Sequence, residues 1–360
     1  MRILQVCQDS YGETGGISVH VRSISERLAK RHDVTVYAAD CESRYPRFEL
    51  RNGVKVERFK CYAPSNAYFF SLEMLLRMRR VEFDVVHAHG YHGLPMHFAG
   101  FAKCSKFVVT THFHGVGHST FRNCLIRLFK PIGKRTLTKA DEIIAVSEYE
   151  KALLCKQFKL PENRIDVVPN GVDFSEFSGI GKRFHDFKSV LYVGYLLGYK
   201  GAHYLVEVLP KLADNVILEI VGTGPIKPLL ERRAKELNVF ERVKFYENLP
   251  RRELLQMYAD ADVFVLLSKH EAYSLAVAEA LTSGTPCIVA DTSALSEWID
   301  NESCFGVDIP VNLNWLARLI SNVLDKGVDK EAMKKWMGIK ILDWNEVVDC
   351  LERHYELDPS

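Results

Sequence analysis

Two glutamates in the second half of the chain are spaced so that they could serve one ligand. Glu271 follows the apolar run VFVLLS (263–268), and Glu279 comes eight residues later, beyond the apolar stretch 275–278. Eight residues are a little over two helical turns, so we expect Glu271 in a loop and Glu279 inside a buried helix. A buried carboxylate needs partners, and ribose or sugar hydroxyls would provide them. The alternatives are a glutamate on the helix's one exposed edge and a hydrolytic acid–base pair.

A lysine and several glycines follow other apolar runs. Lys200 lies in VGYLLGYKG, where a strand is expected to give way to a helix, and could neutralise a diphosphate there together with helix N–H groups. Glycines at such turns let backbone N–H groups approach an anion. They are Gly15 and Gly16 in DSYGETGGISVH, Gly194 next to Tyr195, and Gly222 and Gly224 in VGTGP. Ordinary strand-to-helix turns explain these glycines about as well.

Histidines cluster in two places, in HAHGYH (87–92) and in the segment that holds His112, His114 and His118. No carboxylate or cysteine is interleaved with them at a spacing typical of metal ligands, so we expect no metal site. Instead we expect these histidines to line a cleft, where His114 and His118 would contact an acceptor substrate.

Short apolar runs rich in Val and Ile alternate with longer amphipathic runs along the chain, which is typical of parallel sheets with helices on both faces. Residues 170–188 have no clear period and interrupt the pattern, which then restarts. The sequence therefore predicts an α/β protein with two Rossmann-like, doubly wound domains facing a cleft. Ligands would bind beyond the carboxyl ends of the strands.

Bulk composition favours a cytoplasmic protein of ordinary solubility. The formal net charge is +1, and no nucleic-acid-binding signature is present, so we expect no nucleic-acid partner. The nine cysteines are widely spaced without a CxxC, which favours reduced thiols. The N-terminus does not read as a signal peptide, and no run is long enough to span a membrane.

Segments 69–80 and 121–140 mix basic and apolar residues. One interpretation of each segment is a helix that packs its apolar side on the core, with the second helix broken near Pro131. The other interpretation is a peripheral contact with an anionic membrane.

The ordered set GG loop, TTH, NGVD, VG-x5-KG, E-x7-E and SGTP resembles the GT4 glycosyltransferases, and it covers nearly the whole chain. E-x7-E with ALTSGTP is its most specific part. The resemblance implies a GT-B fold, with an acceptor domain at 1–170 and a nucleotide-sugar donor domain at 171–342. The segment 343–360 resembles the family's closing helix, which packs back on the first domain. The implied reaction retains anomeric configuration and needs no cofactor or metal; the acceptor would be a glycan, a lipid-linked or a small molecule.

The resemblance also implies roles for individual residues. Glu279 would hold the donor's ribose hydroxyls, Glu271 would bond the transferred sugar, and Lys200 would neutralise the departing diphosphate. His112 resembles the family's active-site histidine beside the sugar. Further donor contacts are implied for the amides of Gly15 and Gly16 and for the backbone around Ser274 and Leu275.

The chain departs from the family pattern at two places. Tyr195 stands where relatives commonly carry an arginine that clamps the diphosphate, and Ser293 and Ala294 replace a pair of glycines. Loss of a charged contact to a desolvated phosphate costs about 1.5–3 kcal/mol. Two alternatives to a transferase stay open, and the departures motivate the first of them. One is a catalytically weakened nucleotide-sugar-binding protein, and the other is a nucleotide-sugar epimerase or hydrolase on the same architecture.

Overall fold

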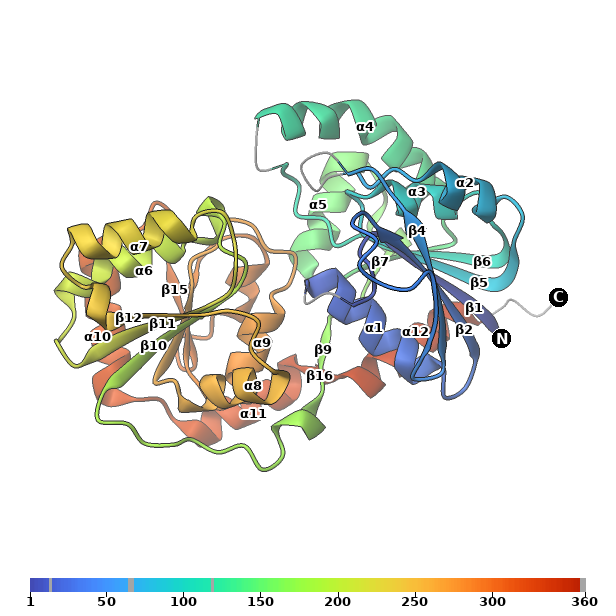
Figure 1. Cartoon of the computed structure of the whole chain (residues 1–360). Coiled ribbons are helices and arrows are strands. Elements are labelled where there is room, and N and C mark those ends of the chain that lie inside the picture. Colours follow the sequence, from blue (N-terminus) through green and yellow to red (C-terminus); the bar gives the residue numbers. More distant parts are fainter. Residues whose placement is uncertain (13–14, 64–67, 118–119, 357–360) are drawn as a thin grey trace. The chain divides into compact units, whose positions relative to one another are not determined.

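A computed structural model describes the chain apart from residues 13–14, 64–67, 118–119 and 357–360, which are grey in Figure 1. The chain separates into two compact units. Unit 1 consists of Met1–Gly171 and Asp343–Ser360, and unit 2 consists of Val172–Leu342. The short strands β9 (Gly171–Val172) and β16 (Leu342–Asp343) pair with each other where this division falls.

Unit 1 is built on a sheet of order β3-β4-β2-β1-β5-β6-β7-β8. Neighbouring strands are parallel except β3 and β4, which form an antiparallel hairpin at one edge. Its strands are β1 (Arg2–Cys7), β2 (Asp33–Asp40), β3 (Phe48–Arg51), β4 (Val54–Lys60), β5 (Glu82–His89), β6 (Lys103–Thr110), β7 (Glu142–Ala145) and β8 (Ile165–Val167).

Helices cover both faces of this sheet. α1 (Gly16–Leu28) packs with α12 (Trp344–Tyr355), and α2 (Leu72–Met78) packs with α3 (Leu94–Ala99). Figure 1 shows these two pairs on opposite faces of the sheet. Side chains alternate along a strand, so Leu4 and Val6 of β1 join the apolar core with α2 and α3, whereas Gln5 faces α12. The remaining helices of unit 1 among the described residues are α4 (Thr120–Lys139) and α5 (Glu148–Phe158).

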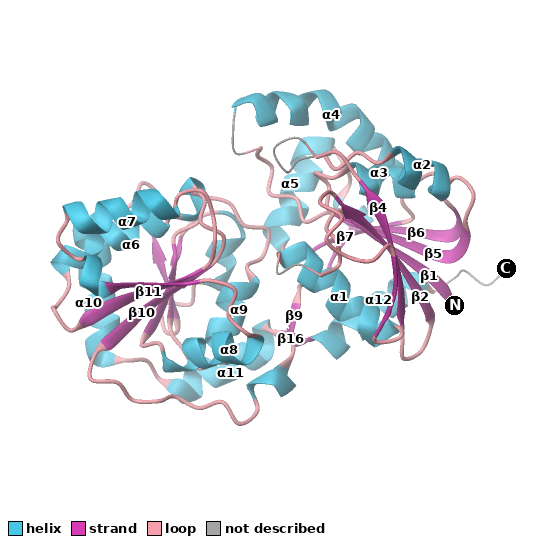
Figure 2. Ribbon diagram, viewed as in Figure 1, coloured by secondary structure: helices cyan, strands magenta, loops and turns pink. Residues whose placement is uncertain are grey.

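Unit 2 contains an all-parallel sheet of order β12-β11-β10-β13-β14-β15. Figure 2 shows its strands, in magenta, between α6 and α7 on one face and α8 and α9 on the other. The strands are β10 (Lys188–Val193), β11 (Val216–Val221), β12 (Val243–Tyr246), β13 (Val263–Leu266), β14 (Cys287–Ala290) and β15 (Cys304–Val307). The helices are α6 (Ala202–Val208), α7 (Lys227–Glu236), α8 (Arg251–Asp260), α9 (Leu275–Thr282), α10 (Leu313–Lys326) and α11 (Lys330–Lys340).

Strand order reverses beside the first long strand of each unit. β1 lies between β2 and β5, and β10 lies between β11 and β13. Loops diverge at the carboxyl ends of the strands on either side of such a reversal, which is where doubly wound sheets bind ligands. In unit 1 these loops carry Gly15 and Gly16 and begin at His89; in unit 2 they carry Gly194 and Glu271. The fold thus places Gly15, Gly194 and Glu271 at the carboxyl ends of the strands of their own units.

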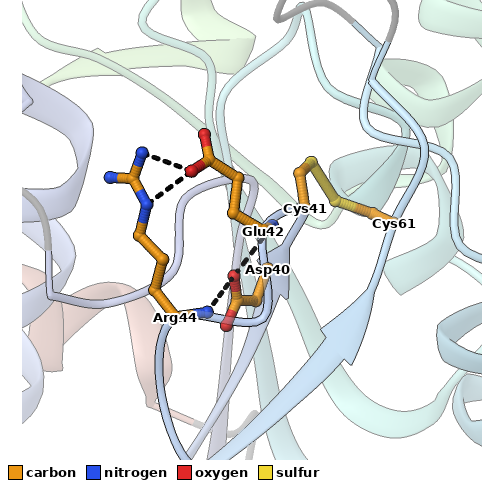
Figure 3. Close-up of a disulfide and its surroundings, with 5 residues drawn as sticks. All are labelled: Asp40, Cys41, Glu42, Arg44 and Cys61. Atoms are coloured by element: carbon orange, nitrogen blue, oxygen red, sulfur yellow. Dashed lines mark hydrogen bonds and ion pairs between the residues drawn. A yellow bond between two sulfur atoms is a disulfide. The ribbon is translucent and has the colours of Figure 1, made fainter.

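The expectation of reduced cysteines is wrong for one pair. Cys41 and Cys61 form a disulfide, shown in Figure 3, with their Cα atoms 4.7 Å apart. Asp40 ends β2 and Lys60 ends β4, and these two residues are partners in the sheet register. The next residue of each strand therefore faces the other at a distance suited to a disulfide. This proximity depends on strand register, which sequence spacing does not reveal.

The predicted interruption of segment 121–140 is also wrong. α4 continues through Pro131 as one helix of 20 residues. A proline removes one backbone hydrogen bond and usually kinks a helix, but the turns on both sides of it can persist. Among the described residues, no helix combines the length and the apolar character needed to cross a bilayer.

Candidate active site

Lys200 and Glu271 form an ion pair in unit 2. Lys200 ends a short 3-10 turn (Gly198–Lys200) after β10, and Glu271 lies in the loop after β13. Lys200 Nζ donates to Glu271 Oε1 at 2.6 Å, and both side chains are mostly buried. Burial alone would lower the pKa of Lys200, but the attraction of Glu271 outweighs it and the pKa is raised. The lysine is therefore a fixed positive charge at the carboxyl ends of the strands.

Ser293 holds the loop that presents Glu271. The backbone N–H of Glu271 donates to Ser293 Oγ at 3.1 Å, and the N–H of Ala294 donates to the carbonyl of Glu271 at 3.3 Å. Ser293 has a φ of 54°, a conformation that favours glycine. The serine thus keeps a backbone shape that a glycine would adopt easily and adds a side-chain hydrogen bond.

Glu279 is buried in the middle of α9 and pairs with a cation. Its Oε1 lies 2.8 Å from Arg251 at the start of α8, and Arg251 Nε also donates to Glu176 at 2.9 Å. Burial raises the pKa of Glu279, and the guanidinium of Arg251 opposes this effect. Ser274, with a φ of 86°, and Leu275 form the start of the same helix. α9 therefore carries a buried carboxylate, and its first residue Leu275 follows a cap, Ser274, that makes no side-chain capping bond.

Two glycines of VGTGP are required by backbone contact within unit 2. A Cβ on Gly222 would lie 2.0 Å from the carbonyl oxygen of Gly194, and one on Gly224 would lie 2.4 Å from that of Leu196. The N–H of Leu196 donates to the carbonyl of Thr223 at 2.7 Å, so the two loops touch directly. These contacts account for Gly222 and Gly224 without a ligand, and a role in donor binding stays a prediction.

Tyr195 projects into solvent, with 51% of its surface exposed. The cations that could replace the missing arginine are each held by a carboxylate. Lys227 pairs with Glu247, Arg232 with Glu236, and Arg251 with Glu279 and Glu176. Lys200 is paired as well, with Glu271, and of these four cations Lys200 and Arg251 are the two that contact predicted site residues.

The Gly15–Gly16 turn of unit 1 differs from the glycine loops of unit 2. Gly15 caps α1 and Gly16 is its first residue. A Cβ on Gly16 would meet no atom within 4 Å, and one on Gly15 only a carboxylate oxygen of Asp9 at 3.9 Å, among the described residues. Neighbouring atoms thus do not require glycine here, which leaves room above the backbone N–H groups.

His112 sits in a strained and tightly held loop. Its φ of 47° lies in the left-handed region, and the residue is 8% exposed. Glu150, buried in α5, accepts from the Thr111 hydroxyl and the Phe113 N–H on either side of it, and from the Val146 N–H at 2.7 Å. Strain of this kind persists where surrounding contacts enforce it, as at functional sites. Glu150 therefore fixes the backbone on both sides of His112.

The rings of two further histidines lie beside that of His112, and the sequence did not predict this contact. His20 of α1 has its ring centroid 4.8 Å from that of His112 and 5.2 Å from that of His89. We call His20, His89 and His112 the histidine cluster. His20 lies on the apolar stripe that α1 turns toward the sheet with Val21 and Ile24, and this placement of a polar residue was the available signal.

Amide and hydroxyl groups orient the rings of this region. Gln5 Oε1 lies 2.7 Å from His89 Nε2, and Asn170 Oδ1 lies 2.7 Å from His20 Nδ1. His87 contacts the Tyr355 hydroxyl of α12 at 2.6 Å. Burial lowers the pKa of His20 to about 4 and those of His87, His89 and His112 well below the usual value. These imidazoles are neutral at pH 7.

The two predicted acceptor contacts are placed differently. His114 is partly buried and stacks on His92, with centroids 4.8 Å apart. His118 lies outside the described residues. His114 is not part of the histidine cluster, and the role of both residues in acceptor binding stays a prediction.

Comparison with known proteins gives two adjoining family matches. Residues 14–176 match Glycosyltransferase Family 4, and residues 173–336 match Glycosyl transferases group 1. An uncharacterized glycosyltransferase of Methanocaldococcus jannaschii is 27% identical over 94% of this chain and 90% of its own length. A GDP-mannose-dependent alpha-(1-6)-phosphatidylinositol monomannoside mannosyltransferase of Mycolicibacterium smegmatis is 26% identical over 82% of each chain.

The fold has solved counterparts. The Anabaena protein HepE, whose structure was determined in complex with UDP-glucose, matches 98% of both chains with a TM-score of 0.78 at 17% identity. Together the matched families cover both units, in the order in which the sequence motifs occur. The chain is therefore a glycosyltransferase that belongs to the GT4 family and has the GT-B fold.

Proposed function

We propose that this glycosyltransferase moves a sugar from a nucleotide-diphosphate donor to an acceptor hydroxyl, with retention of configuration and without a bound metal. The observation that carries the proposal is the site of unit 2, where Lys200 and Glu271 lie 2.6 Å apart and Glu279 lies 2.8 Å from Arg251. This set offers a cation for a diphosphate and carboxylates for hydroxyl groups. The names of relatives that use GDP-mannose or bind UDP-glucose support the same donor class.

In the proposed reaction the bond between the anomeric carbon and the diphosphate oxygen breaks, and the oxygen keeps the electron pair. The acceptor oxygen forms the new bond on the same face of the sugar and passes its proton to the leaving phosphate. Positive charge grows on the sugar and negative charge on the diphosphate, so Lys200 would stabilise the transition state more than the ground state. Glu271 would bond the sugar hydroxyls, and the N–H groups at Gly15–Gly16 would approach the phosphate or acceptor.

The proposal is tested by thermal-shift titration of the full chain with UDP-, GDP- and ADP-sugars in the presence of a chelator. A donor that binds the folded protein raises the melting temperature by mass action. We expect one nucleotide to give a clear shift, and Lys200→Ala to lower the rate of transfer far more than nucleoside affinity. Transfer that needs added metal would contradict the metal-independent mechanism.

A catalytically weakened binding protein is the second candidate, because Tyr195 supplies no positive charge and the other nearby cations are paired. It predicts donor binding without turnover of any acceptor. Consumption of donor in the absence of acceptor would instead favour an epimerase or hydrolase. Tyr195→Arg distinguishes the weakened binding protein from the epimerase or hydrolase, since this substitution should restore turnover in a weakened enzyme.

The acceptor class and membrane contact stay predictions. In α2, Leu72 and Leu76 are exposed, at 57% and 45%, on the helix that also carries Arg77. Such a surface suits an anionic membrane and a lipid-linked acceptor. Flotation with vesicles of anionic and of neutral lipid tests this, with Leu72→Ser and Leu76→Ser expected to reduce binding to the anionic vesicles.

A further inference from the structure

The histidine cluster of unit 1 contains three buried ring nitrogens that lack a hydrogen-bond partner. They are His20 Nε2, His89 Nδ1 and His112 Nε2, and none is bonded to any group in the described part of the chain. His20 and His89 are 1% and 0% exposed. A buried polar atom without a partner is costly, and in a folded protein it usually marks a bound water, an ion or a function.

The hydrogen bonds made by the other ring nitrogens of His20 and His89 determine which nitrogen of each ring carries the proton. A side-chain amide oxygen only accepts hydrogen bonds, so Gln5 Oε1 requires a proton on His89 Nε2, at 2.7 Å. Gln5 is oriented in turn, because its Nε2 donates to the Tyr355 hydroxyl at 3.2 Å. Asn170 Oδ1 places the proton of His20 on Nδ1 in the same way. His20 Nε2 and His89 Nδ1 are therefore unprotonated and present lone pairs.

The three histidines also meet the distance requirement of a metal site. One ring nitrogen from each lies within 4.8 Å of one from each of the other two. A tetrahedral zinc ion with Zn–N bonds of about 2.0–2.1 Å separates its nitrogens by about 3.4 Å. Side-chain rotations that close each gap by at most about 1.4 Å would bring the three nitrogens into that range.

We propose that His20, His89 and His112 bind a divalent cation of the zinc class, with a fourth position open to water or another ligand. Three neutral imidazoles with an open position are an established zinc ligand set, and imidazole favours Zn²⁺ over Mg²⁺ or Ca²⁺. The amide oxygens of Gln5 and Asn170 act on the far ring nitrogens, as the outer hydrogen-bond partners of metal-bound histidines do.

The site has a consequence that rests on the proposed function. His112 is the histidine expected beside the transferred sugar, and a metal bound to its ring would withdraw it from that position. The ion would then be an inhibitor that a chelator removes, and not a participant in the reaction. Zinc should lower the rate of transfer, and Mg²⁺ at the same concentration should not.

The test is a titration of the full, metal-free chain with Co²⁺, which occupies zinc sites and gives visible d–d absorption when coordinated tetrahedrally. It is done without donor or acceptor, so that its outcome does not depend on the proposed function. We expect binding of one equivalent with nitrogen-type bands that Zn²⁺ displaces. His20→Gln and His89→Gln should abolish the bands, whereas the control His185→Gln, which removes a histidine of unit 2, should leave them intact.

Asn170→Ala retains all three ligands, so it tests the site even if the histidine variants fail to fold. Loss of an outer hydrogen-bond partner weakens metal binding about 10- to 100-fold, so we expect a shift of the Co²⁺ titration by that factor. Absence of d–d bands in the wild-type chain would overturn the proposal and leave ordered water as the occupant. Bands that persist in His20→Gln, or intense sulfur-to-cobalt charge transfer, would overturn it in favour of a cysteine site. Unchanged affinity in Asn170→Ala would contradict the tautomer argument on which the site depends.

Discussion

The two units bury their polar residues by different means. In unit 1 the histidine cluster consists of neutral rings, two of which are bonded to side-chain amides, and three of its nitrogens lack a hydrogen-bond partner in the described structure. In unit 2, Lys200 and Glu271, and Arg251 and Glu279, form ion pairs that compensate each other's charge. Burial opposes charging in both places, and of these two sites only the one in unit 2 has countercharges among the described residues. The cluster in unit 1 therefore presents uncharged nitrogen lone pairs, whereas the site in unit 2 presents paired charges that suit the anion and the hydroxyl groups of the proposed donor.

The largest expected effect is acid destabilisation of unit 1. Its buried histidines have lowered pKa values, so between about pH 4 and 6.5 the unfolded chain binds more protons than the folded one. This stability is complete above the unfolded pKa and is lost as pH falls. At about 1.4 kcal/mol per pKa unit, five such histidines could cost several kcal/mol at about pH 5.5. Glu150 acts in the opposite direction, because burial raises its pKa to about 7.

Hydrogen exchange of the full chain, read peptide by peptide at pH 7 and near pH 5.5 and corrected for intrinsic rates, measures this difference. Protection should fall in β1, β5 and α1 much more than in β10, β13 and α9. An equal loss of protection in both units would break the comparison.

The next largest effect is expected for Glu279→Ala. If Glu279 binds the ribose as proposed, its removal should weaken nucleotide binding at least about 10- to 100-fold, because a single charged hydrogen bond is worth about 1.5–3 kcal/mol. Isothermal titration with the nucleotide chosen by the thermal-shift panel measures the loss. Glu253→Ala, an exposed glutamate on α8, is the matched control and should bind normally. Unchanged affinity in Glu279→Ala would remove the ribose assignment.

A smaller effect is expected for Arg251→Gln, which tests whether Arg251 acts as a positioning residue for Glu279. Without the guanidinium the pKa of Glu279 should rise further, so that donor affinity falls more steeply below neutral pH than in the wild type. KM for the donor should rise several-fold with kcat nearly constant, and Arg251→Lys should restore part of it. A loss confined to kcat would show that Arg251 serves the reaction in another way.

The smallest effect is expected for Ser293→Ala. It removes one hydrogen bond to the N–H of Glu271, worth about 1 kcal/mol, in a residue with a left-handed backbone. We expect a loss of roughly fivefold in kcat/KM, since 1.4 kcal/mol corresponds to tenfold. Ser293→Gly keeps the backbone shape and should retain more activity than the alanine variant. Equal losses in the two variants would mean that the lost hydroxyl, and not the backbone conformation, controls the loop.

The sequence by itself determined the α/β class, the family and the local setting of several site residues. Apolar runs of Val and Ile became buried strands, because a strand covered on both faces has no polar side to show. Glu271 and Glu279 fell in a loop and in a buried helix, as their spacing predicted, because helical geometry is local. The roles of these residues, and of Gly15, Ser274 and His114, stay predictions.

Only the tertiary structure decided which distant residues meet. His20 reaches His112 across 92 positions of sequence, Arg251 reaches Glu279, and Ser293 supports Glu271. Cys41 and Cys61 pair because of strand register, and α4 passes through Pro131. Spacing along the chain fixes periodicity within an element, whereas contacts between elements depend on strand order and helix packing. The sequence shows where the chain departs from the family pattern. The effect of each replacement depends on its neighbours in space, which only the fold determines.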